Sequence, residues 1–259
     1  DTMPEALARC GYRNVVFYPM LRNFVSNARF YNAVGMPEVF DLKDQGAKTA
    51  NERDRFYYKN ALDEMGSHFT SSRKPLFTYI QTMSAHSPYN YAYAPEMDVP
   101  GGGPGTDPQM HEYLRRLSMA KLDYDWLRAE IRRRFPKERF LVVHYGDHHP
   151  IATRPFLGYD QYADPEDMTL DAEGTGFITY FAVDGQNYVP PRLPDLDVLD
   201  VPYLGGVILE AARLPLSDSF RERRRLRQVC GGRYHSCSRR EEVLGFHRRL
   251  IESGLLDAR

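Results

Sequence analysis

The sequence has no long apolar run. A helix that crosses a membrane needs about 20 consecutive, mostly apolar residues, and no stretch of the 259-residue chain approaches that length. The first residues also lack the basic and then apolar pattern of a signal peptide. We therefore expect this chain itself to be soluble.

Net charge is nearly absent as well, because 34 lysines and arginines are balanced by 35 aspartates and glutamates. Such a balance gives no overall field that would attract nucleic acid or an anionic membrane. We therefore expect no nucleic-acid partner. Residues 217–228 contain a cluster of arginines that could bind anionic lipid head groups, although a solvated helix face is the commoner outcome of this pattern.

Cysteine is scarce, with three residues in the whole chain. Cys230 and Cys237 bracket a short loop that a disulfide could close, and such bonds persist mainly in extracytoplasmic compartments. Two free thiols and a Cys-His-Cys metal site are the alternatives, but the spacing differs from the usual C-x₂₋₄-C zinc pattern. We favour the disulfide. Cys10 is expected to be a small, buried, apolar residue.

The sequence does contain alternating helix and strand patterns. A hydrophobic content of 42% fits a folded globular protein. Apolar runs predict strands, and apolar residues at three- and four-residue spacing predict helices. Together they predict an α/β fold with a mostly parallel sheet flanked by helices. The predicted strands are 14–19, 76–82, 176–183 and the run that begins at Phe140, and the predicted helices are 4–10, 24–34, 51–65, 201–212, 217–228, 239–255 and one that begins at Asp107.

The run that begins at Phe140 ends in the most informative residues of the chain. Its apolar residues stop at Gly146, and Asp147 and His148 follow directly. Ligands of open α/β sheets bind where strands end at their carboxyl edge. Adjacent strand residues point to opposite faces, so both side chains can serve one metal ion only if the backbone leaves the strand at Gly146. A turn that needs no ion is the alternative.

A second apolar run, residues 76–82, ends shortly before His86. The predicted helix that begins at Asp107 connects this run to the one that ends before Asp147. The resulting βαβ unit should cross over in the right-handed sense and leave both strand ends at one edge. We therefore expect His86 to share a pocket with Asp147 and His148. A loop histidine capped by its neighbours is the alternative.

Residues 84–106 form a long predicted loop. Its glycine-rich part lacks the Gly-Lys-Ser/Thr ending of a phosphate-binding loop, and long loops inside compact domains are usually functional. We therefore expect a lid. The helix that follows has an N-cap at Asp107, and its arginines, including Arg115 and Arg116, are assigned to a solvated face.

Three passages together resemble the sulfatase branch of the alkaline phosphatase superfamily, and within it the lipoteichoic acid synthase and phosphoglycerol transferase type. Residues 10–41 are similar to the family's GY-T-FF…Y-GF-F-D pattern. Residues 82–89 are similar to T-x-x-x-H-x-P-[FY], and residues 145–148 spell the YGDH metal motif. The resemblance implies an alkaline-phosphatase-like (sulfatase) fold.

The resemblance also implies a metal-dependent phosphoester or sulfoester hydrolase or transferase that acts on an anionic substrate, such as a lipid or cell-envelope head group. Asp147 and His148 would bind the divalent metal, which could be Mn, Zn or Mg. His86 would donate a hydrogen bond to the substrate or its leaving group. His144, packed along the strand, and His149, supporting the metal ligands, are weaker candidates.

In this family the nucleophilic Thr or Ser and an acidic metal ligand precede the Gly-Tyr segment, and here only a few residues precede Gly11. We therefore expect residues 1–195 to be the C-terminal portion of a catalytic domain whose N-terminal part is missing, with residues 196–259 as a helical extension packed on it. No catalytic nucleophile is assigned, because Thr70–Ser72 is predicted to be a loop. The resemblance places the full-length protein on the extracytoplasmic or periplasmic face of the inner membrane, with its membrane anchor outside this chain.

The chain departs from the family pattern at two positions. Val25 and Asn27 stand where lipoteichoic acid synthases carry a tryptophan and an arginine near glycerolphosphate, which argues against a glycerolphosphate site. Arg22 or Arg29 could supply the missing charge. The alternative hypothesis for the whole chain is a non-catalytic binding or scaffold domain that keeps the same fold.

Overall fold

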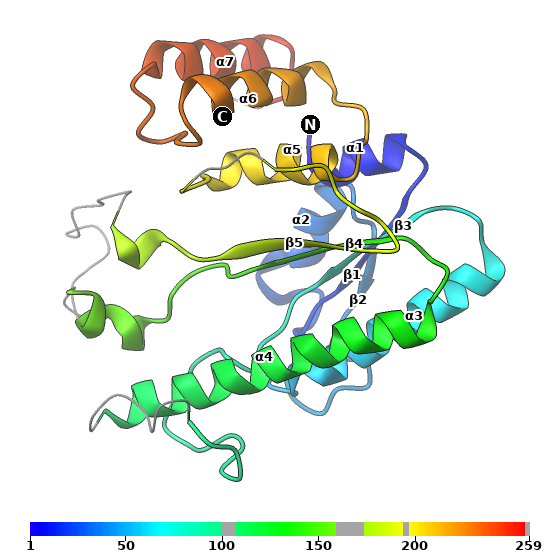
Figure 1. Cartoon of the computed structure of the whole chain (residues 1–259), viewed down its shortest axis with the longest axis vertical. Helices are drawn as coiled ribbons and strands as arrows, with labels where there is room; N and C mark the ends of the chain where they lie inside the picture. The colour runs from blue at the N-terminus through cyan, green and yellow to red at the C-terminus, as the bar shows by residue number, and fades with distance from the viewer. Residues whose placement is uncertain (100–106, 159–173, 194–196, 257–259) are drawn as a thin grey trace. The chain divides into compact units, whose positions relative to one another are not determined.

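The computed structural model describes residues 1–99, 107–158, 174–193 and 197–256, in which helices alternate with strands (Figure 1). The chain divides into two units. The parallel-sheet unit comprises residues 7–136 and 150–167, and the ribbon-helix unit comprises residues 1–6, 137–149 and 168–259. The glycine-rich part of the predicted lid, residues 100–106, lies outside the described residues. The predicted division at residue 195 stays a prediction.

A three-stranded parallel sheet forms the centre of the parallel-sheet unit. β1 (Arg13–Phe17) follows the short helix α1 (Met3–Arg9) and lies between β2 (Glu38–Phe40) and β3 (Leu76–Ile80). Residues 15–17 are buried, as expected of a central strand in a parallel sheet. The predicted α/β fold with a parallel sheet is confirmed. β2 was not predicted, because three residues are too few to show a periodic pattern.

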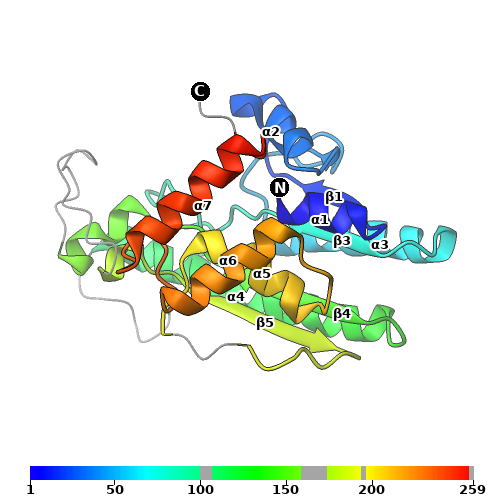
Figure 2. The ribbon, with the colours of Figure 1, turned by 90° about the horizontal axis from the view of Figure 1, so that it is seen from above.

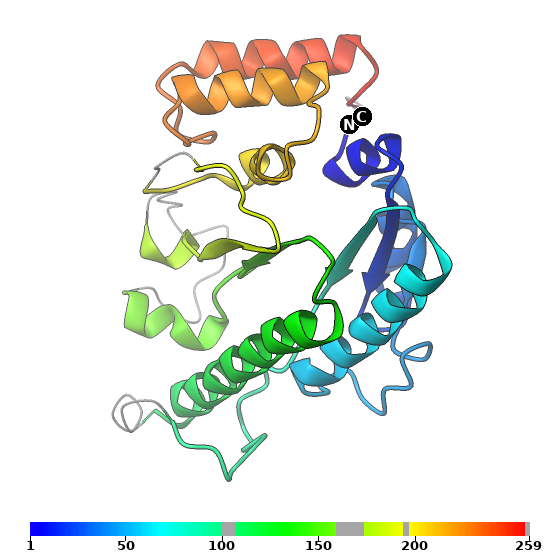
Figure 3. The same ribbon diagram turned by 45° about the vertical axis from the view of Figure 1, so that its right-hand side comes forward.

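Helices flank this sheet. The short 3₁₀ helix η1 (Phe24–Ser26) leads into α2 (Asn27–Ala33), which contacts β2. α3 (Asp54–Ser71) contacts both β3 and α4 (Pro108–Arg134), and Figure 3 shows the two long helices beside each other. The 3₁₀ helix η3 (Ile151–Leu157) contacts α4.

α3 is longer than predicted, and the predicted loop at Thr70 is wrong. Thr70 and Ser71 lie in the last turn of the helix, where both hydroxyls donate to backbone carbonyls one turn back. The Thr70 Oγ1–Ser67 O distance is 2.9 Å and the Ser71 Oγ–Ser67 O distance is 2.8 Å. Serine and threonine often form such bonds within helices, which the polar composition alone does not reveal.

α4 begins as predicted but buries a partly different face. The carboxylate of Asp107 accepts from the backbone N–H groups of the first helical turn, which confirms the N-cap. Apolar residues at three- and four-residue spacing predict a buried stripe that includes Met110, Tyr113, Leu117, Leu127 and Ile131. The structure confirms Met110, Leu127 and Ile131, whereas Tyr113 and Leu117 are only half-buried. The buried residues are Met110, Glu112, Arg116, Met119, Asp123, Leu127 and Ile131. Three of these seven are ionisable, so buried ion pairs and not apolar contacts alone hold this helix.

β4 (Phe140–Tyr145) and β5 (Phe181–Gln186) form an antiparallel ribbon in the ribbon-helix unit. The predicted βαβ unit is therefore wrong in one respect: β3 pairs with β1, whereas β4 pairs with β5 in a second sheet. An apolar run does not say which strand will be its partner, because parallel and antiparallel ladders bury similar side chains. β5 also starts later than predicted, because residues 175–177 form the 3₁₀ helix η4 (Thr175–Phe177).

Three helices complete the ribbon-helix unit: α5 (Val201–Ala211), α6 (Asp218–Val229) and α7 (Arg240–Glu252). α6 packs against both α5 and α7 (Figure 2). Their shared core consists of Tyr203, Leu226, Cys230, Cys237, Val243 and Phe246. The three predicted helices are confirmed. In the described ranges no helix has both the length and the apolarity of a membrane span.

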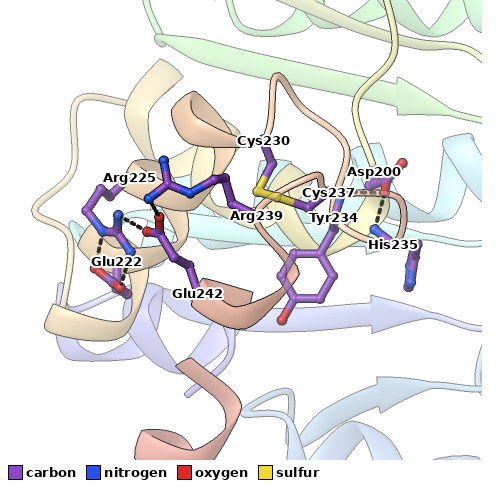
Figure 4. The surroundings of a disulfide bond; sticks show 9 residues. All are labelled: Asp200, Glu222, Arg225, Cys230, Tyr234, His235, Cys237, Arg239 and Glu242. Atoms are coloured by element: carbon purple, nitrogen blue, oxygen red, sulfur yellow. Dashed lines mark hydrogen bonds and ion pairs between the residues drawn. A yellow bond between two sulfur atoms is a disulfide. The ribbon is translucent and has the colours of Figure 1, made fainter. Parts of the chain in front are cut away.

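A disulfide joins Cys230 to Cys237 between α6 and α7 (Figure 4). The loop that it closes is also bound by Asp200, whose Oδ2 accepts from the backbone N–H groups of Tyr234 and His235. The predicted disulfide is thus confirmed, and the free-thiol and metal-site alternatives are wrong. Cys10 is a free thiol and is only half-buried.

Candidate functional site

The backbone leaves β4 at Gly146, as the sequence predicts. The Gly146 N–H donates to the carbonyl of Tyr180, and the Gly146 carbonyl accepts from the Thr179 hydroxyl at 2.7 Å. Thr179 packs directly against this position, since a Cβ there would lie 3.4 Å from the Cβ of Thr179. The strand therefore ends against the segment before β5, and the next residues turn away from the ladder.

Asp147 and His148 follow this exit and face each other. The Nε2 of His148 lies 3.6 Å from the Oδ2 of Asp147, and the two side chains are 68% and 75% exposed. The other carboxylate oxygen of Asp147 accepts from the backbone N–H of His148 at 2.9 Å. The two side chains therefore lie on the same side of the turn, and their binding of a metal stays a prediction.

The ring of His148 is oriented by a second contact. Its Nδ1 lies 3.0 Å from the carbonyl oxygen of His149. A carbonyl oxygen only accepts hydrogen bonds, so Nδ1 is the donor in this contact and Nε2 is the nitrogen that faces Asp147. A backbone carbonyl that fixes the tautomer in this way is a usual partner of metal-binding histidines.

The two neighbouring histidines have structural roles. His149 Nε2 donates to the carbonyl of Ile178 at 2.8 Å, which ties the turn to the segment before β5. His144 lies in β4 with its ring against Tyr180. Burial lowers the pKa of His144 below its ordinary value of 6.5. The expectation that His144 packs along the strand is confirmed.

His86 lies in the loop after β3, in the parallel-sheet unit. Its side chain is exposed, and its Nδ1 lies 2.7 Å from the carbonyl oxygen of Ser87. By the same reasoning as for His148, Nδ1 is the donor in this contact, and Nε2 is not engaged by it. Asp147 and His148 belong to the ribbon-helix unit, so the expectation that His86 shares their pocket stays a prediction.

Arg116 and Glu112 hold the His86 loop. The sequence pattern assigned Arg116 to a solvated face and did not single out Glu112. Arg116 is 1% exposed and its Nη1 donates to the carbonyl of His86 at 2.8 Å. Its Nε donates to Glu112 at 2.7 Å, and Glu112 also accepts from the backbone N–H of Tyr93. The assignment of Arg116 to a solvated face is therefore wrong. Glu112 and Arg116 are four residues apart and lie on the same helix face as Met119 and Leu127. This spacing was the sequence pattern that could have indicated a buried ion pair.

Arg22, considered as a substitute for a missing substrate-binding charge, is already paired. Its guanidinium Nε donates to Asp41 at 3.2 Å, and its Nη2 pairs with Asp44. Burial would raise the pKa of Asp41, but hydrogen bonds from the backbone N–H groups of Asp44 and Arg22 and from other donors hold it below its ordinary value. Val25 is 72% exposed with a positive φ of 43°, a conformation that is rare for a β-branched residue.

Asp147 and His148 suit a divalent metal as two of its ligands. Two ligands of a tetrahedral zinc, each about 2.1 Å from the metal, are about 3.4 Å apart, close to the 3.6 Å between Oδ2 and Nε2. Carboxylate oxygen and imidazole nitrogen are also ligands that zinc and manganese accept. Within the described ranges, no three His, Cys, Asp or Glu side chains gather as a metal site, so these residues would fill only part of a coordination shell.

The sequence profile of the sulfatase family matches residues 1–174, more than half of the 259 residues, and the chain belongs to this family. An uncharacterized protein of Haemophilus influenzae is 21% identical over 224 residues, which is 81% of this chain and 38% of that protein. The chain thus spans well under two thirds of the length of this relative.

Solved structures of the alkaline phosphatase superfamily share the fold. The phosphoglycerol transferase GacH of Streptococcus pyogenes, in complex with sn-glycerol-1-phosphate, has a TM-score of 0.63 and 15% identity over 93% of this chain and 59% of its own. The lipoteichoic acid synthase LtaP of Listeria monocytogenes has a TM-score of 0.55 and 20% identity over 70% of this chain and 45% of its own. A protein of the alkaline phosphatase superfamily from Vibrio parahaemolyticus has a TM-score of 0.54 and 17% identity over 84% of this chain and 52% of its own.

Proposed function

We propose that this chain is the metal-binding and substrate-binding portion of a sulfatase-family enzyme that cleaves or transfers a phosphoester or sulfoester. The observation that carries the proposal is the Asp147–His148 pair. It offers one oxygen and one nitrogen 3.6 Å apart, on exposed side chains, with the histidine tautomer fixed by a backbone carbonyl. Membership of the family and the likeness to transferase folds support the same reaction class.

In this proposal Asp147 Oδ2 and His148 Nε2 hold a divalent metal. Mn, Zn and Mg all remain candidates, because a mixed carboxylate and imidazole set serves more than one of them. When bound, such an ion supplies Lewis-acid polarisation of the ester and a lower pKa for an attacking hydroxyl. The Nδ1 contact of His148 keeps the ring in the orientation that leaves Nε2 available.

His86 is the proposed substrate-binding residue. Its Nδ1 is engaged with the carbonyl of Ser87, so a neutral ring has Nε2 as an acceptor. Protonation at Nε2 turns the same atom into a donor for an anionic ester oxygen or a leaving group. A protonated Nε2 could therefore bind a phosphate or sulfate oxygen.

We infer that the nucleophile and the remaining metal ligands lie outside residues 1–259. A hydroxyl nucleophile needs a base, a lowered pKa or a metal beside it. Thr70 and Ser71 instead direct their hydroxyls to helix carbonyls. The relatives are also longer than this chain, which covers 38% to 59% of their lengths.

For the substrate, we propose an anionic head group of a lipid or cell-envelope polymer. We propose that the reaction takes place outside the cytoplasm, in a protein whose membrane anchor lies outside this chain. The disulfide fits that compartment, because such bonds are rare in reducing cytosol. GacH was solved with sn-glycerol-1-phosphate. Here Val25 and Asn27 differ from the residues of lipoteichoic acid synthases, so we propose a related phosphoester or sulfoester with another alcohol.

The test compares metal content and ester turnover in this chain and in the longest natural form of the protein. The proposal predicts stoichiometric metal and turnover of a model diester or sulfate ester in the longer form, both lost on Asp147→Asn. A matched control is Asp125→Asn, which alters an exposed carboxylate paired with Lys121 on α4. Absence of both metal and turnover in the longer form would support the non-catalytic alternative.

A further inference from the structure

The loop that carries His86 is built around one buried guanidinium. Arg116 donates from Nη1 to the carbonyl of His86 at 2.8 Å and from Nη2 to the carbonyls of Pro88 and Tyr91 at 3.0 and 3.3 Å. The planar guanidinium has five N–H donors in a fixed fork. Three carbonyls of one loop therefore converge on a single side chain whose geometry does not adapt freely.

The charge of Arg116 is neutralised and stacked within the same unit. Its Nε donates to Glu112 at 2.7 Å, and its Cζ lies 4.8 to 5.5 Å from the ring centroids of three loop tyrosines, Tyr89, Tyr91 and Tyr93. A buried charge is costly unless it is paired and hydrogen-bonded, and cation–π contacts add to the pairing. Arg116 is thus satisfied only when the loop is wrapped around it.

From these contacts we propose that Arg116, held by Glu112, is the positioning residue for His86. The proposal rests on the substrate-binding role proposed for His86. Arg116 holds the carbonyl of His86, and the His86 N–H donates to the carbonyl of Met83 at 3.0 Å. Both backbone groups of His86 are therefore fixed, and the Nδ1 contact with Ser87 fixes the ring. The three restraints set where Nε2 points.

The two ends of the loop are held in the same manner. At its start, the Ser84 N–H donates to the buried carboxylate of Asp54 at 3.1 Å. After His86, Glu112 accepts from the backbone N–H of Tyr93, and Arg115 donates to the carbonyl of Pro95 at 3.2 Å. These anchors limit the loop on both sides, so a change at Arg116 should alter His86 locally and leave the fold of the unit in place.

The first arm of the test uses ester turnover by the longest natural form of the protein. Arg116→Lys keeps the charge but loses the fork, and Arg133→Met removes an exposed arginine of the same helix as the control. We expect Arg116→Lys to lower kcat about 100-fold, as small misplacements of a catalytic group do, with a smaller change in KM. The loss should vanish in a His86→Ala background, because Arg116 acts through His86. An equal loss in both backgrounds, or no loss, would overturn the proposal.

The second arm does not need turnover. Nitrogen-15 NMR of the histidine rings and amide hydrogen exchange of residues 84–93 are measured for wild type, Arg116→Lys and Arg133→Met. We expect a shifted His86 ring signal and faster amide exchange in the loop only in Arg116→Lys. All three proteins should still unfold in one cooperative thermal transition, which shows that each of them is folded. An unchanged His86 signal would overturn the positioning role. If no ester is turned over by wild type, the proposed function fails while this arm still decides the positioning.

Discussion

The two loops that carry the candidate side chains follow β3 and β4, and they hold these side chains differently. The turn after β4 exposes Asp147 and His148, whose side chains are 75% and 68% exposed. The loop after β3 wraps around Arg116, which is 1% exposed. The first loop thus holds its exposed side chains only by short local contacts, whereas the second is ordered by the chain's own buried charges.

This difference in burial predicts which substitutions alter only the proposed reaction and which also alter the stability of the fold. A side chain that is mostly exposed and weakly bonded contributes little to folding, so its removal should alter the reaction alone. A buried ion pair that holds a loop contributes to both, because the loop conformation and the fold share the same contacts.

The largest effect should follow from Asp147→Asn in the longest natural form. We expect turnover to fall about 1,000-fold or more, because a bound metal supplies several kcal/mol of transition-state stabilisation and each 1.36 kcal/mol is about tenfold in rate. With metal removed from both proteins, the melting temperature should stay within about 1–2 °C of wild type, since substitutions of exposed residues cost at most about 0.5 kcal/mol. Steady-state kinetics and thermal unfolding measure the two effects. A large fall in melting temperature would remove the contrast between the loops.

Glu112→Gln tests the anchored loop. It leaves the guanidinium of Arg116 buried without its counter-charge, and we expect a loss of about 3–5 kcal/mol in the free energy of unfolding. Urea denaturation followed by circular dichroism measures this change. Asp125→Asn, on the exposed face of the same helix, is the control and should cost less than about 0.5 kcal/mol. Equal effects of the two substitutions would contradict the assignment of Glu112 as a buried anchor.

The disulfide offers a stability change remote in sequence from both loops. Replacing Cys230 and Cys237 by serine should lower the free energy of unfolding by about 2–3 kcal/mol, the range expected for a loop of this size. The melting temperature should fall by roughly 2–4 °C for each kcal/mol. Differential scanning calorimetry of the oxidised, reduced and double-serine proteins measures the gap. Identical melting of the oxidised and reduced forms would show that the bond does not restrain the unfolded chain.

The smallest predicted effect depends on pH. Backbone N–H groups and Arg22 hold the pKa of Asp41 below its ordinary value of 3.8, in spite of its burial. A lowered pKa means that the carboxylate stabilises the folded state above pH 3.8 and loses this contribution as the pH falls through the folded pKa. Asp41→Asn should therefore cost about 1–2 kcal/mol at pH 7 and progressively less below pH 3.8. Urea denaturation across this range measures the gap, and a gap that widens toward low pH would contradict the sign.

The motif at residues 145–148 could be recognised from the sequence because its chemistry is local. An apolar run, a glycine and an adjacent Asp-His pair already predict a strand, an exit and two ligands on one side. Local reasoning also predicted the helix start at Asp107 and the bond between Cys230 and Cys237, and both are confirmed, whereas metal binding by Asp147 and His148 stays a prediction. In each case the interacting groups are close in sequence, so their spacing limits the possible geometry.

The tertiary structure decided what spacing could not. The sequence places Arg116 in an arginine-rich helix, where a solvated face is the usual outcome. Arg116 is buried because the loop folds over it and the carbonyls of His86, Pro88 and Tyr91 accept its hydrogen bonds. The partner of β4 was also undetermined, because an apolar strand can pair in either direction and β5 provides the antiparallel ladder. Short-range chemistry was therefore set by the sequence, whereas the pairing of distant backbone groups depended on which buried donors and acceptors folding brought together.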